Sequence, residues 1–187
     1  MIDTSGLRRG LVIDLDGELL RVSEFQHMKQ GRGSASVKLT LKNLRTGSTT
    51  SQTFQGGSRF NPVRLERIRA QFLYADEAFY YFMDVDTFEQ FQLDAETLGA
   101  AIDYLTEEMV IELLTHEGQA IDIELPTAVE LEVTETDPGF RGDTATGGSK
   151  PAKLETGLSV TVPLFVTIGD RIKVDTRTGE YLERVTS

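Results

Sequence analysis

Short apolar segments that alternate with polar residues fill most of this chain, and turn sequences separate them. The clearest case is residues 34–44, where Val37, Leu39 and Leu41 alternate with Lys38, Thr40 and Lys42. This period of two predicts an antiparallel strand with one buried face, and here the outer face is basic. Many such strands, spaced by roughly 8–12 residues, are typical of β-barrels and sandwiches. We therefore expect an all-β protein.

Local signals support this class. Asp16-Gly17 lies between two apolar runs within residues 11–28 and predicts a hairpin with a type I′ turn. The chain has one good helix candidate, residues 94–105, with Asp94 as its N-cap and one apolar face.

The chain length fits several small domains. At roughly 150 residues per domain, 187 residues suggest one domain or two, but small β-barrels allow three. Asn61-Pro62 and Pro126 mark turns at which segments end. We therefore predict three domains, residues 1–65, 66–126 and 127–187, each of which would be marginally stable alone.

Charge is distributed unevenly over these three segments. The chain as a whole has a net charge of −11. Residues 1–65 nevertheless contain ten Lys and Arg against five Asp and Glu, residues 66–126 two against fifteen, and residues 127–187 seven against ten. The asymmetry either has no function or indicates that the N-terminal third contacts nucleic acid, with the acidic middle repelled by phosphates.

Residue types that support catalysis or metal binding are scarce. The chain has no cysteine, and its two histidines, His27 and His116, fall in different predicted domains. Asp84-Val85-Asp86 lacks the glycine and glutamate of a calcium loop, and no glycine-rich segment has P-loop spacing. We expect no metal, no cofactor and no enzymatic activity.

Targeting and membrane signals are also lacking. No apolar run is long enough to span a bilayer, and the N-terminal segment has no apolar signal core. Together with the missing cysteines, this favours a cytoplasmic location without membrane association.

One loop has a composition that suggests function. Residues 29–35 link two predicted strands of the basic segment, and glycines flank Arg32 on both sides. The glycines permit a tight turn and remove neighbouring side-chain bulk, so that the five guanidinium donors of Arg32 would project from a narrow tip. The loop is either a plain hairpin turn with a solvated arginine or a cationic probe for a phosphate-rich cavity.

The same residues resemble a known family from end to end. The segment Gln30-Gly31-Arg32-Gly33-Ser34-Ala35 is similar to the Pro-Gly-Lys-Gly-x-Ala loop of bacterial translation elongation factor P, EF-P. The C-terminal third matches more strongly, through Asp-Pro-Gly-Phe-Arg-Gly-Asp-Thr at residues 137–144 and Asp-Thr-Arg-Thr-Gly-Glu-Tyr at residues 175–181.

This resemblance implies an L-shaped molecule of three small barrels, an SH3-like KOW domain followed by two OB-fold domains. It also implies a factor that binds the ribosome between the P and E sites, positions the P-site peptidyl-tRNA and stimulates peptide-bond formation. Such a factor relieves stalling at consecutive prolines. Its partners would be the rRNA of both subunits and the P-site tRNA, and we expect a monomer.

The resemblance assigns roles to two groups of residues. The tip would approach the CCA end of the tRNA in the peptidyl-transferase centre, and it comprises Lys29, Gly31, Arg32, Gly33 and Ser34. The other end of the molecule would contact the small subunit near the E-site codon, through Gly142, Asp143, Thr144, Tyr181 and Arg184.

The tip departs from the family at two positions. Many members carry a modified lysine where this chain has Arg32, which has no amine for that chemistry. Some arginine-bearing members are rhamnosylated, but their tips usually lack a glycine equivalent to Gly33. We therefore favour an unmodified Arg32, with a modifying enzyme acting on Arg32 as the alternative. Gln30 replaces a common proline and leaves the tip less restricted.

Two other identities compete with EF-P. The EF-P-like paralogue lacks the Gly-Asp-Thr loop and the Asp-Thr-x-x-Gly-Glu-Tyr run, both of which are present here. A generic OB or KOW RNA-binding module would need exposed aromatic side chains for base stacking. The first 65 residues contain no tyrosine or tryptophan, and their phenylalanines are Phe25, Phe54 and Phe60.

Overall fold

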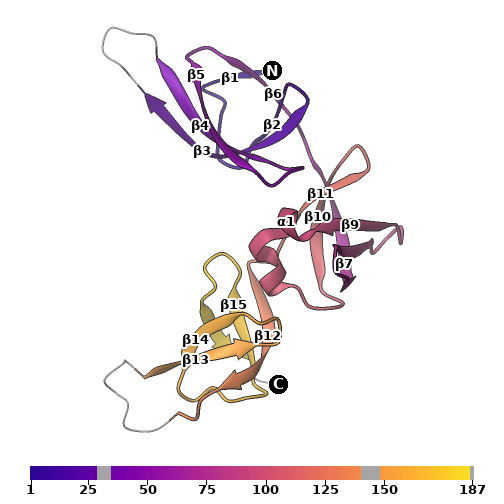
Figure 1. The fold of residues 1–187 in the computed structure, drawn as a ribbon, viewed down its shortest axis with the longest axis vertical. Helices are drawn as coiled ribbons and strands as arrows, with labels where there is room; N and C mark the ends of the chain where they lie inside the picture. The colour runs from indigo at the N-terminus through magenta and orange to yellow at the C-terminus, as the bar shows by residue number, and fades with distance from the viewer. Residues whose placement is uncertain (29–34, 140–147, 186–187) are drawn as a thin grey trace.

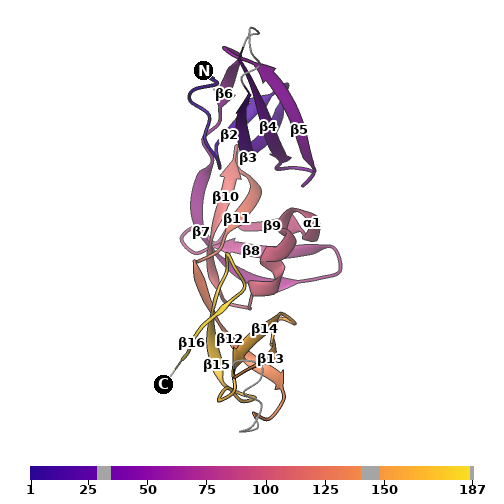
Figure 2. The same ribbon diagram turned by 90° about the vertical axis from the view of Figure 1, so that its left-hand side faces the viewer.

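The computed structural model describes residues 1–28, 35–139 and 148–185. Within them the chain forms three antiparallel sheets, one after another along the long axis of the molecule (Figures 1 and 2). Each sheet curls around an apolar core of its own. The expected all-β class with three small barrels is confirmed.

The first barrel is a six-stranded sheet in the order β1-β6-β2-β3-β4-β5. Its strands are β1 (Ile2–Asp3), β2 (Val12–Leu15), β3 (Glu18–Met28), β4 (Ser36–Asn43), β5 (Thr49–Gln55) and β6 (Arg59–Pro62). Asp16 and Gly17 both have positive φ, 54° and 84°, so the predicted turn between β2 and β3 is confirmed. The predicted alternation along β4 is also confirmed, because Val37, Leu39 and Leu41 are buried.

The central barrel is a five-stranded sheet in the order β11-β10-β7-β8-β9. Its strands are β7 (Glu66–Ala75), β8 (Phe79–Asp84), β9 (Gln90–Asp94), β10 (Val110–His116) and β11 (Gln119–Glu124). Phe82 and Leu113 lie fully buried at its centre.

The single helix predicted over residues 94–105 is wrong in its length. Asp94 does cap the helix, since its Oδ1 accepts the backbone N–H of Thr97 at 2.7 Å. However, α1 spans only Ala95–Leu98, and a 3₁₀ helix continues over Gly99–Tyr104. Gly99 adopts φ 53°, outside the right-handed helical region, and ends the α-helix there.

The third barrel is a five-stranded sheet in the order β14-β13-β12-β15-β16. Its strands are β12 (Ala128–Thr136), β13 (Ser149–Leu154), β14 (Ser159–Pro163), β15 (Arg171–Asp175) and β16 (Tyr181–Arg184). Leu131, Leu154 and Ile172 are among its fully buried side chains.

Direct contacts join each barrel to the next. Between the first and central barrels, Val12, Leu19 and Leu44 form a small apolar cluster with Ile121. Beside it, Arg21 Nη1 lies 2.9 Å from Asp122 Oδ2. Tyr104 of the central barrel packs into the core of the third barrel.

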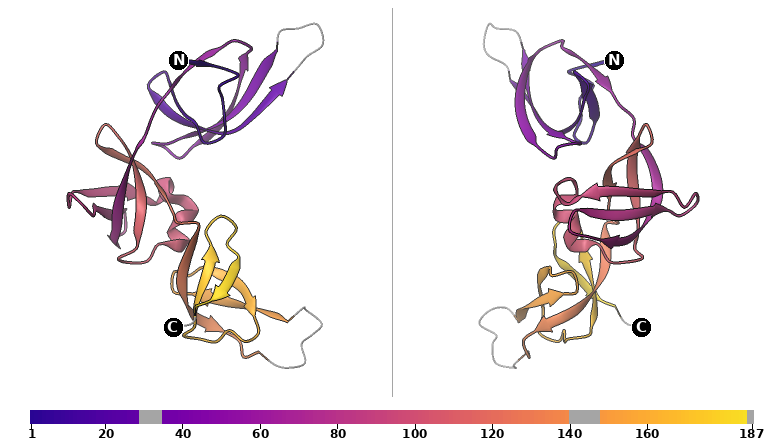
Figure 3. Two further views of the ribbon diagram at one scale, coloured as in Figure 1. Left: turned by 180° about the vertical axis from the view of Figure 1, so that it is seen from behind. Right: turned by 45° about the vertical axis from the view of Figure 1, so that its right-hand side comes forward.

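The molecule is bent, because the central barrel is set to one side of the other two (Figure 1). The end of β3 and the start of β4 point away from the central barrel, and the end of β12 and the start of β13 lie on the same side of the molecule (Figures 1 and 3). The strands of each sheet fall within one of the three predicted segments. That each segment is an independent domain stays a prediction.

Candidate RNA-binding surfaces

The predicted tip, Lys29 to Ser34 with Arg32 at its centre, lies outside the described residues. The strands on either side of it, β3 and β4, are described. Met28 of β3 pairs with Ser36 of β4 at the outer end of the hairpin. Beyond a bulge near Val22, β3 is exposed from Glu24 to His27. The outer end of the β3–β4 hairpin therefore extends beyond the core of the first barrel.

The predicted basic outer face of β4 continues onto β5. Lys38 and Lys42 pair across the sheet with Thr53 and Thr49, and Thr40 pairs with Ser51. Their side chains share one side of the sheet, which we call the basic face. It offers two ammonium groups and four hydroxyl groups, all of which can contact phosphate oxygens. Neither lysine forms an ion pair with another described residue.

The residues expected at the other end of the molecule are partly described. Tyr181 and Arg184 both lie on β16. Tyr181 packs against the core of the third barrel. The Arg184 guanidinium lies 5.2 Å from the centre of the Phe165 ring and 3.7 Å from Asp170 Oδ2. Gly142, Asp143 and Thr144 lie outside the described residues.

The loop that contains these three residues begins and ends at close contacts. A Cβ on Gly139 would clash with the Leu164 carbonyl oxygen, so only glycine lets the two backbones approach there. At the other end, the backbone N–H of Leu164 donates to Gly148 O at 3.2 Å.

The central barrel carries an aromatic surface of a different kind. Tyr74 and Tyr81 stack with their ring centres 4.7 Å apart. The Tyr81 hydroxyl donates to Asp76 Oδ2 at 2.8 Å. Backbone N–H groups of Phe79 and Ala78, with this hydroxyl, lower the pKa of Asp76, so the surface stays anionic. Repulsion of phosphates by this carboxylate argues against RNA binding here.

The described residues show no metal-binding group. No group of three or more His, Asp or Glu side chains that could hold a metal ion is found among them. His27 lies on β3 and His116 on β10, in different barrels. No helix in the described part of the chain is long and apolar enough to cross a membrane.

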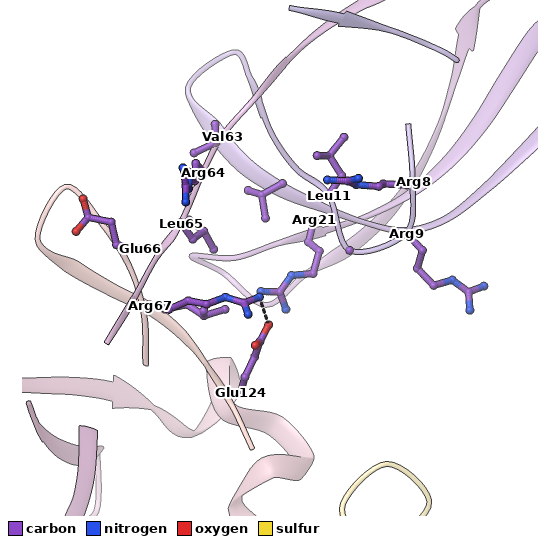
Figure 4. A pocket seen from close by; sticks show the side chains of 13 residues that line it. Arg8, Arg9, Leu11, Arg21, Val63, Arg64, Leu65, Glu66, Arg67 and Glu124 are labelled. Carbon is purple, nitrogen blue, oxygen red and sulfur yellow. Dashed lines mark hydrogen bonds and ion pairs between the residues drawn. The ribbon is translucent and has the colours of Figure 1, made fainter. Parts of the chain in front are cut away.

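Sequence reasoning missed a third basic surface. A cleft of about 1280 Å³ opens where the first barrel meets the central one, and five arginines line it (Figure 4). They are Arg8, Arg9, Arg21, Arg64 and Arg67. No local sequence motif predicts this site, because its arginines come from separate elements. These are the turn before β2, strand β3, the connection between the two barrels, and strand β7.

Comparisons with known proteins cover all three barrels. Residues 3–60 match the elongation factor P (EF-P) KOW-like domain, residues 65–123 the EF-P OB domain, and residues 129–184 the elongation factor P C-terminal domain. Elongation factor P of Moorella thermoacetica is 53% identical over 184 residues, which cover 98% of this chain and 100% of that protein. The chain belongs to the elongation factor P family.

Other relatives agree with this membership. Elongation factor P of Pelotomaculum thermopropionicum is 50% identical over 185 residues, 99% of this chain and 100% of that protein. The solved structure of eukaryotic translation initiation factor 5A from Methanococcus jannaschii covers 66% of this chain and 90% of its own, with a TM-score of 0.52 and 19% identity. At that identity it supports the fold alone.

Family membership confirms the resemblance found in the sequence. The protein is a translation elongation factor, which implies interaction with the ribosome, and it is not an enzyme of a conventional kind. The cytoplasmic location and the monomeric state stay predictions.

Proposed function

We propose that the protein binds the ribosome between the P and E sites, positions the P-site peptidyl-tRNA and stimulates peptide-bond formation at consecutive prolines. The observation that carries this proposal is the match to EF-P domains along the whole chain. The basic face of the first barrel and the outward direction of the β3–β4 hairpin support it.

Positioning is the mechanism that these residues can provide. Proline is a poor participant in peptide-bond formation because its ring restricts backbone geometry. Holding the CCA end in a reactive orientation lowers the barrier without any acid or base from the factor, and orientation effects can reach several kcal/mol. Arg32 would supply the contact with the tRNA, through a planar guanidinium with five donors. The ribosome would carry out the chemistry.

Arg32 is proposed to act unmodified. Its guanidinium is charged at any physiological pH and has its full set of donors without added chemistry. Rhamnosylation by a modifying enzyme is the alternative, and the intact mass of natively expressed protein distinguishes the two states.

A generic RNA-binding module is a weaker candidate. Such modules stack bases on exposed aromatic side chains. Among the described residues of the first barrel, Phe25 is the one exposed large aromatic, and His27 already packs edge-on against it at 5.7 Å.

Ribosome stalling on a defined message tests the proposal. In a reconstituted translation system, a reverse-transcription stop reports ribosomes that pause at a Pro-Pro-Pro codon run. We expect added protein to remove this stop and to leave a pause caused by a missing aminoacyl-tRNA unchanged. A Pro-Pro-Pro pause that persists at saturating protein would overturn the proposal.

A further inference from the structure

The cleft between the first and central barrels has walls from both barrels and from the connection between them. Arg8, Arg9 and Arg21 belong to the first barrel, Arg64 to the connection, and Arg67 to β7 of the central barrel (Figure 4). Aliphatic residues complete the lining, namely Leu11, Val12, Val63, Leu65 and Leu114. Glu66 and Glu124 are its two acidic members.

Hydrogen bonds in the main chain hold the cationic walls in place. The turn that presents Arg8 and Arg9 is tied to β3, since the backbone N–H of Gly10 donates to Val22 O at 2.8 Å. The connection that presents Arg64 is tied to β2 in the same way, by Val63 N–H to Val12 O at 2.8 Å. Both walls are therefore built on strands of the first barrel.

The five arginines fall into two groups by their partners. Arg21 and Arg67 are committed to ion pairs, Arg21 to Asp122 at 2.9 Å and Arg67 to Glu124 at 3.0 Å. Their charges are largely compensated.

The other three arginines retain charge for a ligand. Arg9 lies 3.8 Å from Glu24, and both side chains are more than two-thirds exposed, so this pair is weak. Arg8 and Arg64 form no ion pair with any described residue. Glu66 is the one carboxylate of the lining without an ion pair to a described residue, so the cleft keeps a net positive charge.

The chemistry of this lining points to a phosphate chain. The cleft is larger than the roughly 300–1,000 Å³ of typical small-ligand pockets, which favours a polymer segment over a single small anion. It has no aromatic ring for stacking a base and no Asn or Gln side chain for reading a base edge. Guanidinium groups bind phosphate oxygens in a bidentate manner irrespective of sequence.

We propose that the cleft is a second RNA site, separate from the tip and the basic face, in which Arg8, Arg9 and Arg64 bind the phosphate backbone of double-helical RNA. A duplex is favoured over a single strand, because only a single strand gains from stacking and the cleft offers none. The choice of RNA as the polyanion rests on the proposed function; the anion site itself does not.

Binding of a fluorescent RNA hairpin tests this site directly. Anisotropy titrations at several salt concentrations compare the full-length wild type with the double variant Arg8→Ala, Arg64→Ala. We expect the variant to bind about tenfold more weakly and to lose about two from the slope of log K against log salt, near one for each phosphate contact. Neither substitution breaks an ion pair, so circular dichroism and thermal unfolding should be unchanged.

A matched control separates the cleft from overall charge. The double variant Arg45→Ala, Arg59→Ala removes two exposed arginines of the same barrel that do not line the cleft. It should lose no more than about twofold in affinity, because neither arginine contacts a phosphate held in the cleft. Equal losses in both double variants would overturn the proposal.

Two further comparisons identify the occupant and separate this proposal from the proposed function. In the first comparison, poly-glutamate, inorganic triphosphate and unlabelled duplex RNA compete with the fluorescent hairpin, each titrated on the same scale of negative-charge concentration. If poly-glutamate or triphosphate displaces the hairpin at a lower concentration of negative charge than duplex RNA does, RNA is not the ligand. Arg32→Ala should lose less affinity for the hairpin than the cleft variant does, as expected for a site separate from the tip. A loss equal to that of the cleft variant would overturn a separate site. A protein that fails to relieve Pro-Pro-Pro pauses but binds the hairpin through Arg8 and Arg64 would refute the proposed function alone.

Discussion

Asp175, at the end of β15, receives several hydrogen bonds from one neighbouring residue. Its carboxylate accepts the backbone N–H of Arg177 at 2.8 Å and the Nε and Nη2 of the same side chain at 3.1 and 2.6 Å. The Arg177 side chain and then its backbone N–H lower the pKa of Asp175 from 3.8 to about 2. The Asp175 carboxylate is therefore ionised at any pH at which translation takes place.

This pKa shift predicts a pH-dependent stability. A depressed pKa in the folded state stabilises the fold above 3.8, the unfolded value, and that contribution is lost as the pH falls toward about 2. Asp175→Asn should therefore lower the free energy of unfolding at neutral pH, and its deficit against wild type should shrink through that acid window. Urea unfolding at a series of pH values measures this deficit, and Arg177→Gln should show the same trend. A deficit that is constant with pH would contradict it.

Single residues also show why the sequence could not reveal every site. Arg32 can be singled out from sequence because its flanking glycines are adjacent in the chain. Arg8, Arg21 and Arg67 are far apart in sequence and meet only where two barrels join. Their proximity depends on the angle between sheets, which no local pattern encodes.

At the scale of elements, β4 could be predicted almost completely. Period-two alternation specifies which side of the strand is buried, and the register then places Lys38 and Lys42 opposite the hydroxyl groups of β5. The helix after Asp94 could be predicted only at its start, where the cap is local. Gly99 ends the α-helix, and the 3₁₀ helix after it places Tyr104 in the third core, next to Leu105 in the central core, an arrangement that no local pattern specifies.

The basic face predicts a salt-dependent contact with the ribosome. Replacing both Lys38 and Lys42 by glutamate should weaken ribosome binding and flatten its dependence on salt, since two phosphate contacts would become repulsive. Binding measured by pelleting with ribosomes at several salt concentrations tests this. The control is replacement of the same lysines by arginine, which keeps the charge and should keep the affinity. Unchanged binding by the glutamate variant at every salt concentration would exclude this face as the contact.

At the scale of the whole molecule, two joints set the relative positions of the barrels. The first combines the Ile121 cluster with the pair between Arg21 and Asp122. The second combines Tyr104, which is buried to 8% exposure against the third barrel, with a hydrogen bond that the Thr176 hydroxyl donates to Pro126 O at 2.6 Å. These two joints set the bend of the described part of the molecule (Figure 1).

The second joint predicts a large effect of one buried ring. Tyr104→Ala should lower the free energy of unfolding by about 3 kcal/mol, because it leaves a cavity between two barrels. Tyr74→Ala removes the same atoms from an exposed ring stacked on Tyr81 and should cost no more than about 1.5 kcal/mol. Urea unfolding of both variants compares them. Similar losses would show that Tyr104 does not hold the joint.

The central claim is that the assembled molecule delivers one arginine to the peptidyl-transferase centre. The most direct test is the rate of peptide-bond formation on a Pro-Pro-Pro template with wild type, Arg32→Ala and Arg32→Lys, beside a proline-free template. We expect Arg32→Ala to fold within about 0.5 kcal/mol of wild type and to lose most of the stimulation. Arg32→Lys keeps the charge without the planar fork, so it should be partly active, and the proline-free template should respond to none of the three. Equal stimulation by wild type and Arg32→Ala would contradict the account.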